Sequence, residues 1–449
     1  MSAALAGARR STDSASVRGF AADRTASLFV AVAFLGISTP QLLNFFRIVP
    51  VVAVLLLIAL HLGAAAGRGV SRTRFAVAPL LLVGWLGATT FWSDGRFLSI
   101  VQSASTLMVV LVAALVGTTC SFRALVRGVA LGGLLVLALS LAVALAAPGT
   151  GLMPDGYQGG ALRGLYVHRN LLAEVLTPAY LAALCMAIAP PRALLKRLVL
   201  AAVLLGGILL TRSSTALAAV AAATGVALLV FLVQRVPRRF RQVPLVGAVA
   251  VVAAGAIVVV NNPADVLALL GRDSTLTGRA LIWQIVQQLI ARRPLTGYGW
   301  GATWDPTDPI GKTVSTLAKF DVPSAHNGYL DAWIQAGAIG LGAFLLLVAV
   351  VVVRGVRLVL RSESPLARWA PVFVSAVLVY NIGEADLDSP LVIFLLTATL
   401  TRLLTAQREG DATLEPTPAD ADQVMTVDRP AWSRRSRATI SHPTDAATV

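Results

Sequence analysis

The sequence predicts an all-α membrane protein that crosses the bilayer about twelve times. Three observations support this fold class. Of the 449 residues, 57% are hydrophobic and only 13% are charged, which is more apolar surface than a soluble domain can bury. The apolar residues fall into runs of about 17–25, the length that a helix needs to span a bilayer. The short loops between these runs are alternately rich and poor in Arg and Lys, which is the positive-inside pattern.

The apolar runs place most of the spans in residues 26–260 and the last three in residues 329–406. When both termini are cytoplasmic, most of the 37 basic residues lie in inner loops or in the terminal segments. We therefore attribute the net charge of +15 to topology and to anionic lipid headgroups, not to nucleic acid. The spans are expected near residues 26–46, 48–66, 75–92, 100–119, 125–147, 171–190, 195–210, 215–233, 243–260, 329–353, 368–382 and 390–405.

The segments outside the spans differ in character. Residues 1–25 and 407–449 are polar and lack apolar periodicity, so we expect disordered cytoplasmic segments. Two outer connections are long, at about 148–170 and 261–328, and loops of that length are usually functional or disordered. The inner loops are too short to hold a nucleotide-binding domain, which disfavours ATP-driven transport within this chain.

The second long loop contains a helix pattern at residues 278–293. Thr277 can cap its start, and Pro294 ends it. The pattern is too short and too polar to span a bilayer, so we expect this helix to lie along the outer membrane interface. Its apolar residues recur at spacings of three and four: Leu281, Ile282, Ile285, Val286, Leu289 and Ile290.

Polar residues gather at the predicted outer ends of several spans. Burying a charged side chain at that depth in the bilayer costs free energy, so such side chains usually face a bundle interior or an aqueous cavity. Four separate stretches therefore bring basic groups to one membrane level. The residues concerned are Arg163, His168, Arg169, Asn170, Arg212, Arg279, Trp283, His326 and Asn327, with Glu174 and Asp331 about one turn inside their spans.

A group of arginines near helix N-termini is suited to binding phosphate, because guanidinium groups and the first helical N–H groups all donate hydrogen bonds to an anion. Contact with lipid headgroups is the alternative for any single outer arginine, and we keep it for Arg292 and Arg293. His326 precedes a helix, whose positive end disfavours a protonated imidazole and suits the ring to act as a base. A helix-capping role is the alternative for His326.

The stretch "LTGRALIWQIVQQLIARRPLTGYGWGATW", followed by "SAHNGYLDAWIQAGAIGLGAFLLL", resembles the O-antigen ligase and polysaccharide polymerase superfamily. The shared features are a Gly-Arg pair, a Trp, a Pro-x-x-Gly-x-Gly turn, His-Asn-x-Tyr-Leu and a Gly-x-x-Gly stretch. The segment "RGLYVHRN" is similar to one in the exopolysaccharide-polymerase branch of that family. The resemblance covers residues from about 160 to 345.

The resemblance implies a metal-independent glycosyltransferase without a cofactor. Its partners would be a glycan linked to a polyprenyl diphosphate, as donor, and a glycan or lipid acceptor outside the inner membrane. It implies that Arg279 contacts the donor diphosphate and that His326 activates the acceptor. Where the family has a basic residue before the eighth span, this chain has Ser214, and Arg212 is the candidate substitute.

Direct attack of a sugar hydroxyl on the anomeric carbon would invert its configuration, while arginines stabilise the departing diphosphate. A polymerase is slightly favoured over a ligase by "RGLYVHRN". The main alternative is a secondary transporter of a small anion, which would place its site near the bilayer midplane. A membrane protease is a third possibility, because Ser324 lies beside His326, although no nucleophile turn is visible.

Overall fold

The computed structural model describes residues 23–38, 76–156, 159–187, 194–247, 279–305 and 307–406. The predicted span 48–66, most of the span 243–260, and Thr277 lie outside these residues. The same holds for nearly all of the two terminal segments.

The described residues form helices and contain no strand. Residues 23–38 are helical, and every predicted span that falls within the described residues is a helix, although α14 continues to Arg361, beyond the expected end at residue 353. The remaining helices are α3 (Val77–Ala88), η3 (Thr89–Phe91), α4 (Arg96–Thr119), α5 (Phe122–Ala146), α6 (Pro148–Gly151), α7 (Arg169–Ala187), α8 (Leu194–Leu210), α9 (Ser214–Arg235), η5 (Arg238–Phe240), α12 (Arg279–Arg292), α13 (Pro309–Ala318), α14 (Gly328–Arg361), η7 (Pro365–Arg368), α15 (Trp369–Gly383) and α16 (Pro390–Ala406).

Among the described helices, five are long and apolar enough to cross a membrane: α4, α5, α9, α14, and the continuous helix Leu366–Gly383 that contains α15. Two more, Val77–Phe91 and Pro390–Ala406, are apolar but shorter. The chain is therefore a helical membrane protein, and the total of about twelve spans stays a prediction.

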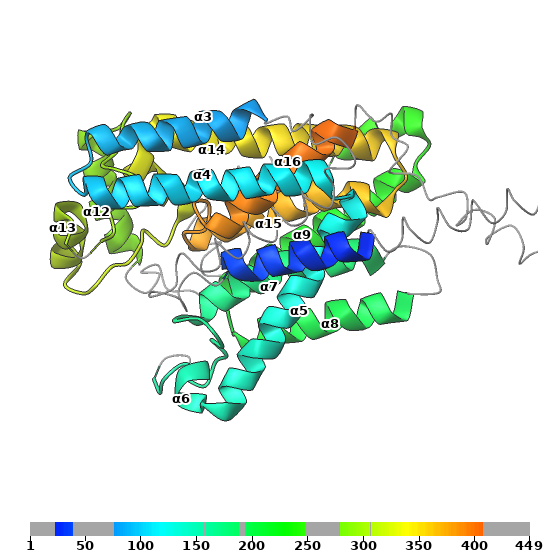
Figure 1. Ribbon diagram of the computed structural model, residues 1–449, viewed down its shortest axis with the longest axis horizontal. Coiled ribbons are helices and arrows are strands. Elements are labelled where there is room, and N and C mark those ends of the chain that lie inside the picture. The colour runs from blue at the N-terminus through cyan, green and yellow to red at the C-terminus, as the bar shows by residue number, and fades with distance from the viewer. Residues whose placement is uncertain are drawn as a thin grey trace, which may run out of the picture.

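The helices form a bundle in which α4 packs on α16, α3 on α14, α9 on α15, and α7 between α5 and α8 (Figure 1). Small residues allow close approach, as is usual between membrane helices. At Gly117 of α4, for example, an added Cβ would lie 2.6 Å from the backbone oxygen of Ala398 in α16. Figure 1 shows α12 and α13 together at one end of the bundle.

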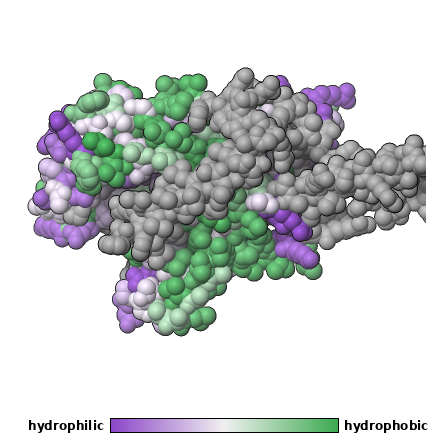
Figure 2. Space-filling view, in the orientation of Figure 1, coloured by the Kyte–Doolittle hydropathy of each residue, from purple (hydrophilic) through white to green (hydrophobic). Residues whose placement is uncertain are grey.

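Two of the predicted inner loops, residues 234–242 and 354–368, contact each other. The guanidinium of Arg241 is buried, and it donates hydrogen bonds to the carbonyl groups of Gln234 (3.0 Å) and Val359 (3.3 Å) and to the carboxylate of Glu363 (3.3 Å). In Figure 2, hydrophilic residues gather at both ends of the described part, and hydrophobic residues form patches between them. The orientation of the chain in the membrane stays a prediction.

Helix α12 lies within the predicted amphipathic segment 278–293. Its apolar face is buried in a small core with α13 and the start of α14, where Val286 and Leu289 join Val314 and Ile334. Its position along the outer membrane interface stays a prediction.

Helix α14 is broken at Gly337, and the turn after α12 fills the break. Gly337 has φ 70° and ψ 179°, and an added Cβ would lie 2.1 Å from the backbone oxygen of Leu295. In the Pro-x-x-Gly-x-Gly turn, Gly297 has φ 66° and packs on the backbone of Gly337, and Gly299 has φ 130° and packs on the side chain of Ser93. The hydrogen bonds across the break run from Tyr298 N to Ile334 O (2.9 Å), Gly299 N to Gln335 O (2.9 Å) and Ala338 N to Pro294 O (2.8 Å).

Candidate active site

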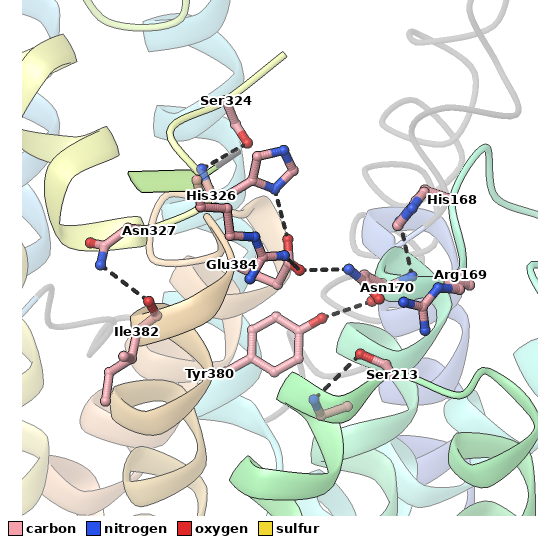
Figure 3. Close-up of polar contacts among 12 residues, drawn as sticks. His168, Arg169, Asn170, Ser213, Ser324, His326, Asn327, Tyr380, Ile382 and Glu384 are labelled. Carbon is pink, nitrogen blue, oxygen red and sulfur yellow. Dashed lines mark hydrogen bonds and ion pairs between the residues drawn. The ribbon is translucent and has the colours of Figure 1, made fainter. Parts of the chain in front are cut away.

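The carboxylate of Glu384 is the centre of the candidate site (Figure 3). One of its oxygens, Oε1, lies 2.6 Å from Nη2 of Arg279 and accepts a hydrogen bond from Nδ2 of Asn170 at 2.5 Å. The other oxygen, Oε2, lies 3.1 Å from Nδ1 of His326. The Glu384 side chain is 10% exposed. A single carboxylate thus joins three of the residues singled out in the sequence, from α7, α12 and the start of α14.

The backbone around Glu384 is fixed by the contact between α15 and α14. Glu384 follows the last residue of α15, and its carbonyl accepts a hydrogen bond from the N–H of Gly328, the first residue of α14 (2.9 Å). Gly328 must be a glycine here, because an added Cβ would lie 1.7 Å from Oδ1 of the buried Asn381. The end of one helix and the start of the other are therefore held together, and Glu384 and His326 with them.

His326 has a left-handed backbone, with φ 49°, which is unfavourable for a residue with a side chain. The preceding residue, Ala325, is held on both sides: its carbonyl accepts from Nε1 of Trp283 (3.0 Å), and its N–H donates to Oδ1 of Asp331 (2.8 Å). Asn327 then caps α14 by accepting from the N–H groups that follow it. Trp283, Asp331 and Asn327 are thus placed to orient the imidazole.

The local charges decide the protonation state of Glu384. Burial alone would raise the pKa of the Glu384 carboxyl, but the hydrogen bond with His326 and the positive charge of Arg279 outweigh it, so the pKa is lowered. Glu384 is therefore ionised at neutral pH. An ionised carboxylate can only accept hydrogen bonds, so Nδ1 of His326 carries the proton of this contact, and Nε2 is the ring nitrogen left for a substrate.

His168 lies beside the same group of charges. Its pKa is lowered, first by burial and further by the charges of Arg169, His326 and Arg279, while Glu384 acts in the opposite direction. The N–H of Asn170 donates to Nδ1 of His168 at 3.2 Å, so the neutral ring carries its proton on Nε2. His168 is accordingly a neutral hydrogen-bond donor at this end of the bundle.

The N-termini of four helices surround Glu384. Helix α12 begins at its partner Arg279, α14 begins two residues after its partner His326, and α7 begins one residue before Asn170. The start of α9 is also near, because an added Cβ at Gly383 would contact Thr215 (3.0 Å) as well as Arg279 (3.6 Å). Helix N-termini carry partial positive charge and unsatisfied N–H groups, so this end of the bundle favours an anion.

The other predicted arginines lie against backbone carbonyls. Arg169 donates to the carbonyl groups of Thr211 (3.1 Å) and Arg212, which ties α7 to the turn before α9. The Arg212 side chain is exposed and donates to the Gly159 carbonyl (3.1 Å). Ser214 is the first residue of α9 and is exposed.

Arg163 donates through three nitrogens to the carbonyl groups of Gly149 (2.9 Å), Thr150 (2.8 Å) and Val167 (3.4 Å). These contacts hold the first long loop. Among the described residues, no hydrogen bond or ion pair joins the side chain of Arg163 or Arg212 to Glu384, so their predicted contact with the donor remains a prediction.

The central carboxylate, that of Glu384, was not among the residues predicted from the sequence. Glu384, Asp386 and Asp388 all lie in "GEADLDSP", the connection between α15 and α16. Asp388 accepts from Nε2 of Gln335 (3.0 Å), and the predicted Glu174 accepts from Ser389 (2.7 Å). The position of this acidic turn was the one signal that the sequence offered. The turn follows a span that runs outward according to the charge pattern, so it lies at the membrane level of the predicted site.

Residues 199–345 match the family model described as O-antigen ligase. The chain is also similar to "Exopolysaccharide production protein ExoQ" from Rhizobium meliloti, with 30% identity over 204 residues. That alignment covers 42% of this chain and 45% of the relative, so the chain spans less than half the length of the curated protein it matches. Together the two matches confirm that the chain resembles the O-antigen ligase and polysaccharide polymerase superfamily, as its motifs indicate.

Proposed function

We propose that this protein transfers a glycan from a polyprenyl diphosphate carrier to an acceptor hydroxyl. The observation that carries the proposal is the meeting of a guanidinium, an imidazole and an ionised carboxylate: Arg279 and His326 bind the two oxygens of Glu384. This arrangement supplies an oriented base and a fixed cation at one place, which are the two groups that such a transfer requires.

In the proposed reaction, Nε2 of His326 accepts the proton of the acceptor hydroxyl while that oxygen attacks the anomeric carbon of the donor sugar. Glu384 holds the ring through Nδ1 and stabilises the imidazolium that forms. General base catalysis of this kind typically contributes roughly 100- to 10,000-fold to the rate. Attack from the side opposite to the leaving group inverts the configuration at the anomeric carbon.

As the new bond forms, the bond between the anomeric carbon and the diphosphate oxygen breaks, and that oxygen keeps the electron pair. Arg279 and the surrounding helix N-termini stabilise the growing negative charge. Losing one such contact typically costs about 3 kcal/mol of barrier. Because the ion pair with Glu384 already holds the Arg279 guanidinium at 2.6 Å, the arginine is positioned before the donor arrives.

A polymerase is favoured over a ligase. The name of the similar protein refers to exopolysaccharide production, and the segment "RGLYVHRN" resembles the exopolysaccharide branch of the family. The acceptor would then be another glycan repeat, with a lipid or cell-wall acceptor as the alternative. The charge pattern supports a site on the outer face of the cytoplasmic membrane with both termini in the cytoplasm.

Deletion of the gene, followed by analysis of surface glycans, tests the proposal. A polymerase predicts that long chains disappear while single repeats remain. A ligase predicts that long chains persist but lose their anchor. Unchanged glycans in both respects would contradict glycan transfer.

The break in α14 at Gly337 is the one feature that favours a transporter, because transporters often bind substrates at broken helices. In this chain, however, the turn 294–299 already occupies the break and satisfies its backbone groups. Uptake of a small anion by proteoliposomes that contain the purified protein would revive that alternative.

A further inference from the structure

A polar cavity adjoins Glu384, and the proposed reaction does not use it. The cavity has a volume of about 210 Å³. Ala385, the residue after Glu384, and Leu171, the residue after Asn170, both line it. Since Glu384 and Asn170 are hydrogen-bonded to each other, the cavity lies next to the centre of the candidate site.

The lining is built for hydrogen bonding. The side chain of Tyr166, which is 5% exposed, lines this space together with Ser38. The polar residues of the lining are Ser38, Gln102, Tyr166, Glu174, Asp388 and Ser389.

The charge around the cavity is opposite to that around Arg279. The carboxyls of Glu174 and Asp388 line the cavity, and those of Asp331 and Asp386 are their neighbours. Acidic side chains gathered in so small a space disfavour a further negative charge. Burial, together with the neighbouring Glu174, raises the pKa of Asp386 well above its usual range.

Such a lining disfavours binding of the negatively charged diphosphate, which we expect to bind near Arg279 and the helix N-termini. It suits an uncharged group with many hydroxyls, because carboxyl, amide and hydroxyl side chains match the donors and acceptors of a sugar ring. The apolar side chains of Leu171, Val175 and Leu391 complete the cavity and can cover the C–H face of such a ring.

We propose that this cavity is a saccharide subsite, which binds one sugar ring of a substrate while the diphosphate lies on the side of Arg279. The inference rests on the proposed glycan transfer. The ring belongs either to the acceptor or to the donor glycan, and the two sources give different kinetics.

Tyr166→Phe tests the subsite, because it removes one hydroxyl from the cavity lining and keeps the aromatic ring. The assay uses the full-length protein in nanodiscs and polyprenyl-diphosphate-linked repeats extracted from cells that lack the gene. The oligosaccharide released from those repeats serves as the acceptor. We expect KM for one saccharide substrate to rise about tenfold or more, because a site that hydrogen-bonds a hydroxyl depends strongly on that contact.

Glu174→Gln is the second variant, since a glutamine keeps the shape and can still accept from Ser389 but removes a carboxyl from the cavity lining. Tyr180→Phe is the control: the hydroxyl it removes contacts Thr224 at 3.3 Å, away from the cavity lining. The control should leave both KM values unchanged.

An assay of donor hydrolysis, in which water replaces the acceptor, distinguishes the two possible sources of the ring. If the acceptor binds in the cavity, Tyr166→Phe raises KM for the acceptor and leaves hydrolysis unchanged. If the donor sugar binds there, KM for the donor rises in both reactions. Wild-type transfer with unchanged KM values in both cavity variants overturns the subsite alone. A wild-type protein that transfers no glycan overturns the proposed function, and this subsite with it.

Discussion

Oε2 of Glu384 lies 3.1 Å from Nδ1 of His326, although 58 residues separate the two in the sequence. This contact gives the histidine an orientation and leaves its Nε2 available to a substrate. The resemblance to the O-antigen ligase family predicts that His326 is the reactive histidine. The structure adds the carboxylate that holds it.

His326→Ala should abolish the formation of surface glycan, because no other group in the described site can replace an oriented imidazole base. The rate should fall by about 100-fold or more. The measurement is glycan analysis in cells that carry the variant in place of the wild type. His442→Ala, which changes a histidine far along the C-terminal segment, is the control. Normal glycan in the His326→Ala strain, with equal amounts of membrane-inserted protein, would remove His326 from the mechanism.

Arg279→Ala should impair use of the lipid-linked donor by about 100-fold, which corresponds to roughly 3 kcal/mol of barrier. Arg279→Lys should recover only part of this, because a lysine keeps the charge but loses the planar fork. Arg293→Ala is the matched control on the same segment, where the guanidinium is exposed and lies 5.0 Å from the ring of Tyr298. Equal losses in Arg279→Ala and Arg293→Ala would show that Arg279 has no special contact with the donor.

Gly337→Ala should destabilise the fold, because φ is 70° and an added Cβ would lie 2.1 Å from the backbone oxygen of Leu295. The backbone strain alone costs about 1–3 kcal/mol. Thermal unfolding of the purified protein, followed by tryptophan fluorescence, measures the effect. Gly342→Ala is the control in the same helix, since nothing lies within 4 Å of its added Cβ. A Tm for Gly337→Ala equal to that of the control would argue against the docked turn.

Stability at low pH should depend on Glu384. Its pKa is lowered in the folded protein, so its contribution is fully present above the ordinary value of 4.5 and is lost as the pH falls through the lower native value. Below pH 4.5, the wild-type Tm should therefore fall more steeply than that of Glu384→Gln, which lacks the titrating group. Parallel curves for the two proteins would contradict an ionised Glu384 paired with Arg279.

The sequence predicted the helices well, because an apolar run long enough to span a bilayer can adopt few structures other than a helix. It also singled out His326, Arg279 and Asn170, which the structure brings together at Glu384, and their roles stay predictions. It did not identify Glu384, because an acidic turn between spans carries no motif. Only the packing of α14 against α15 shows that the carboxylate faces His326.

The partner that covers the apolar face of α12 could not be predicted, for a different reason. An amphipathic pattern reports that one face avoids water, but it does not say whether lipid or protein covers that face. Here α13 and the first part of α14 pack against it. Gly297, after α12, is also explained only in three dimensions, because its added Cβ would lie 2.5 Å from the backbone nitrogen of Gly337 at the break in α14.

A double-mutant cycle on glycan transfer tests the central claim most directly. Purified wild type, His326→Ala, Glu384→Gln and the double variant would be compared in nanodiscs, with release of polyprenyl diphosphate as the readout. If Glu384 acts by holding His326, each single change lowers the rate strongly, and the double variant is little slower than His326→Ala alone. Independent effects whose free energies add up, or a His326→Ala protein that transfers glycan at the wild-type rate, would contradict the account.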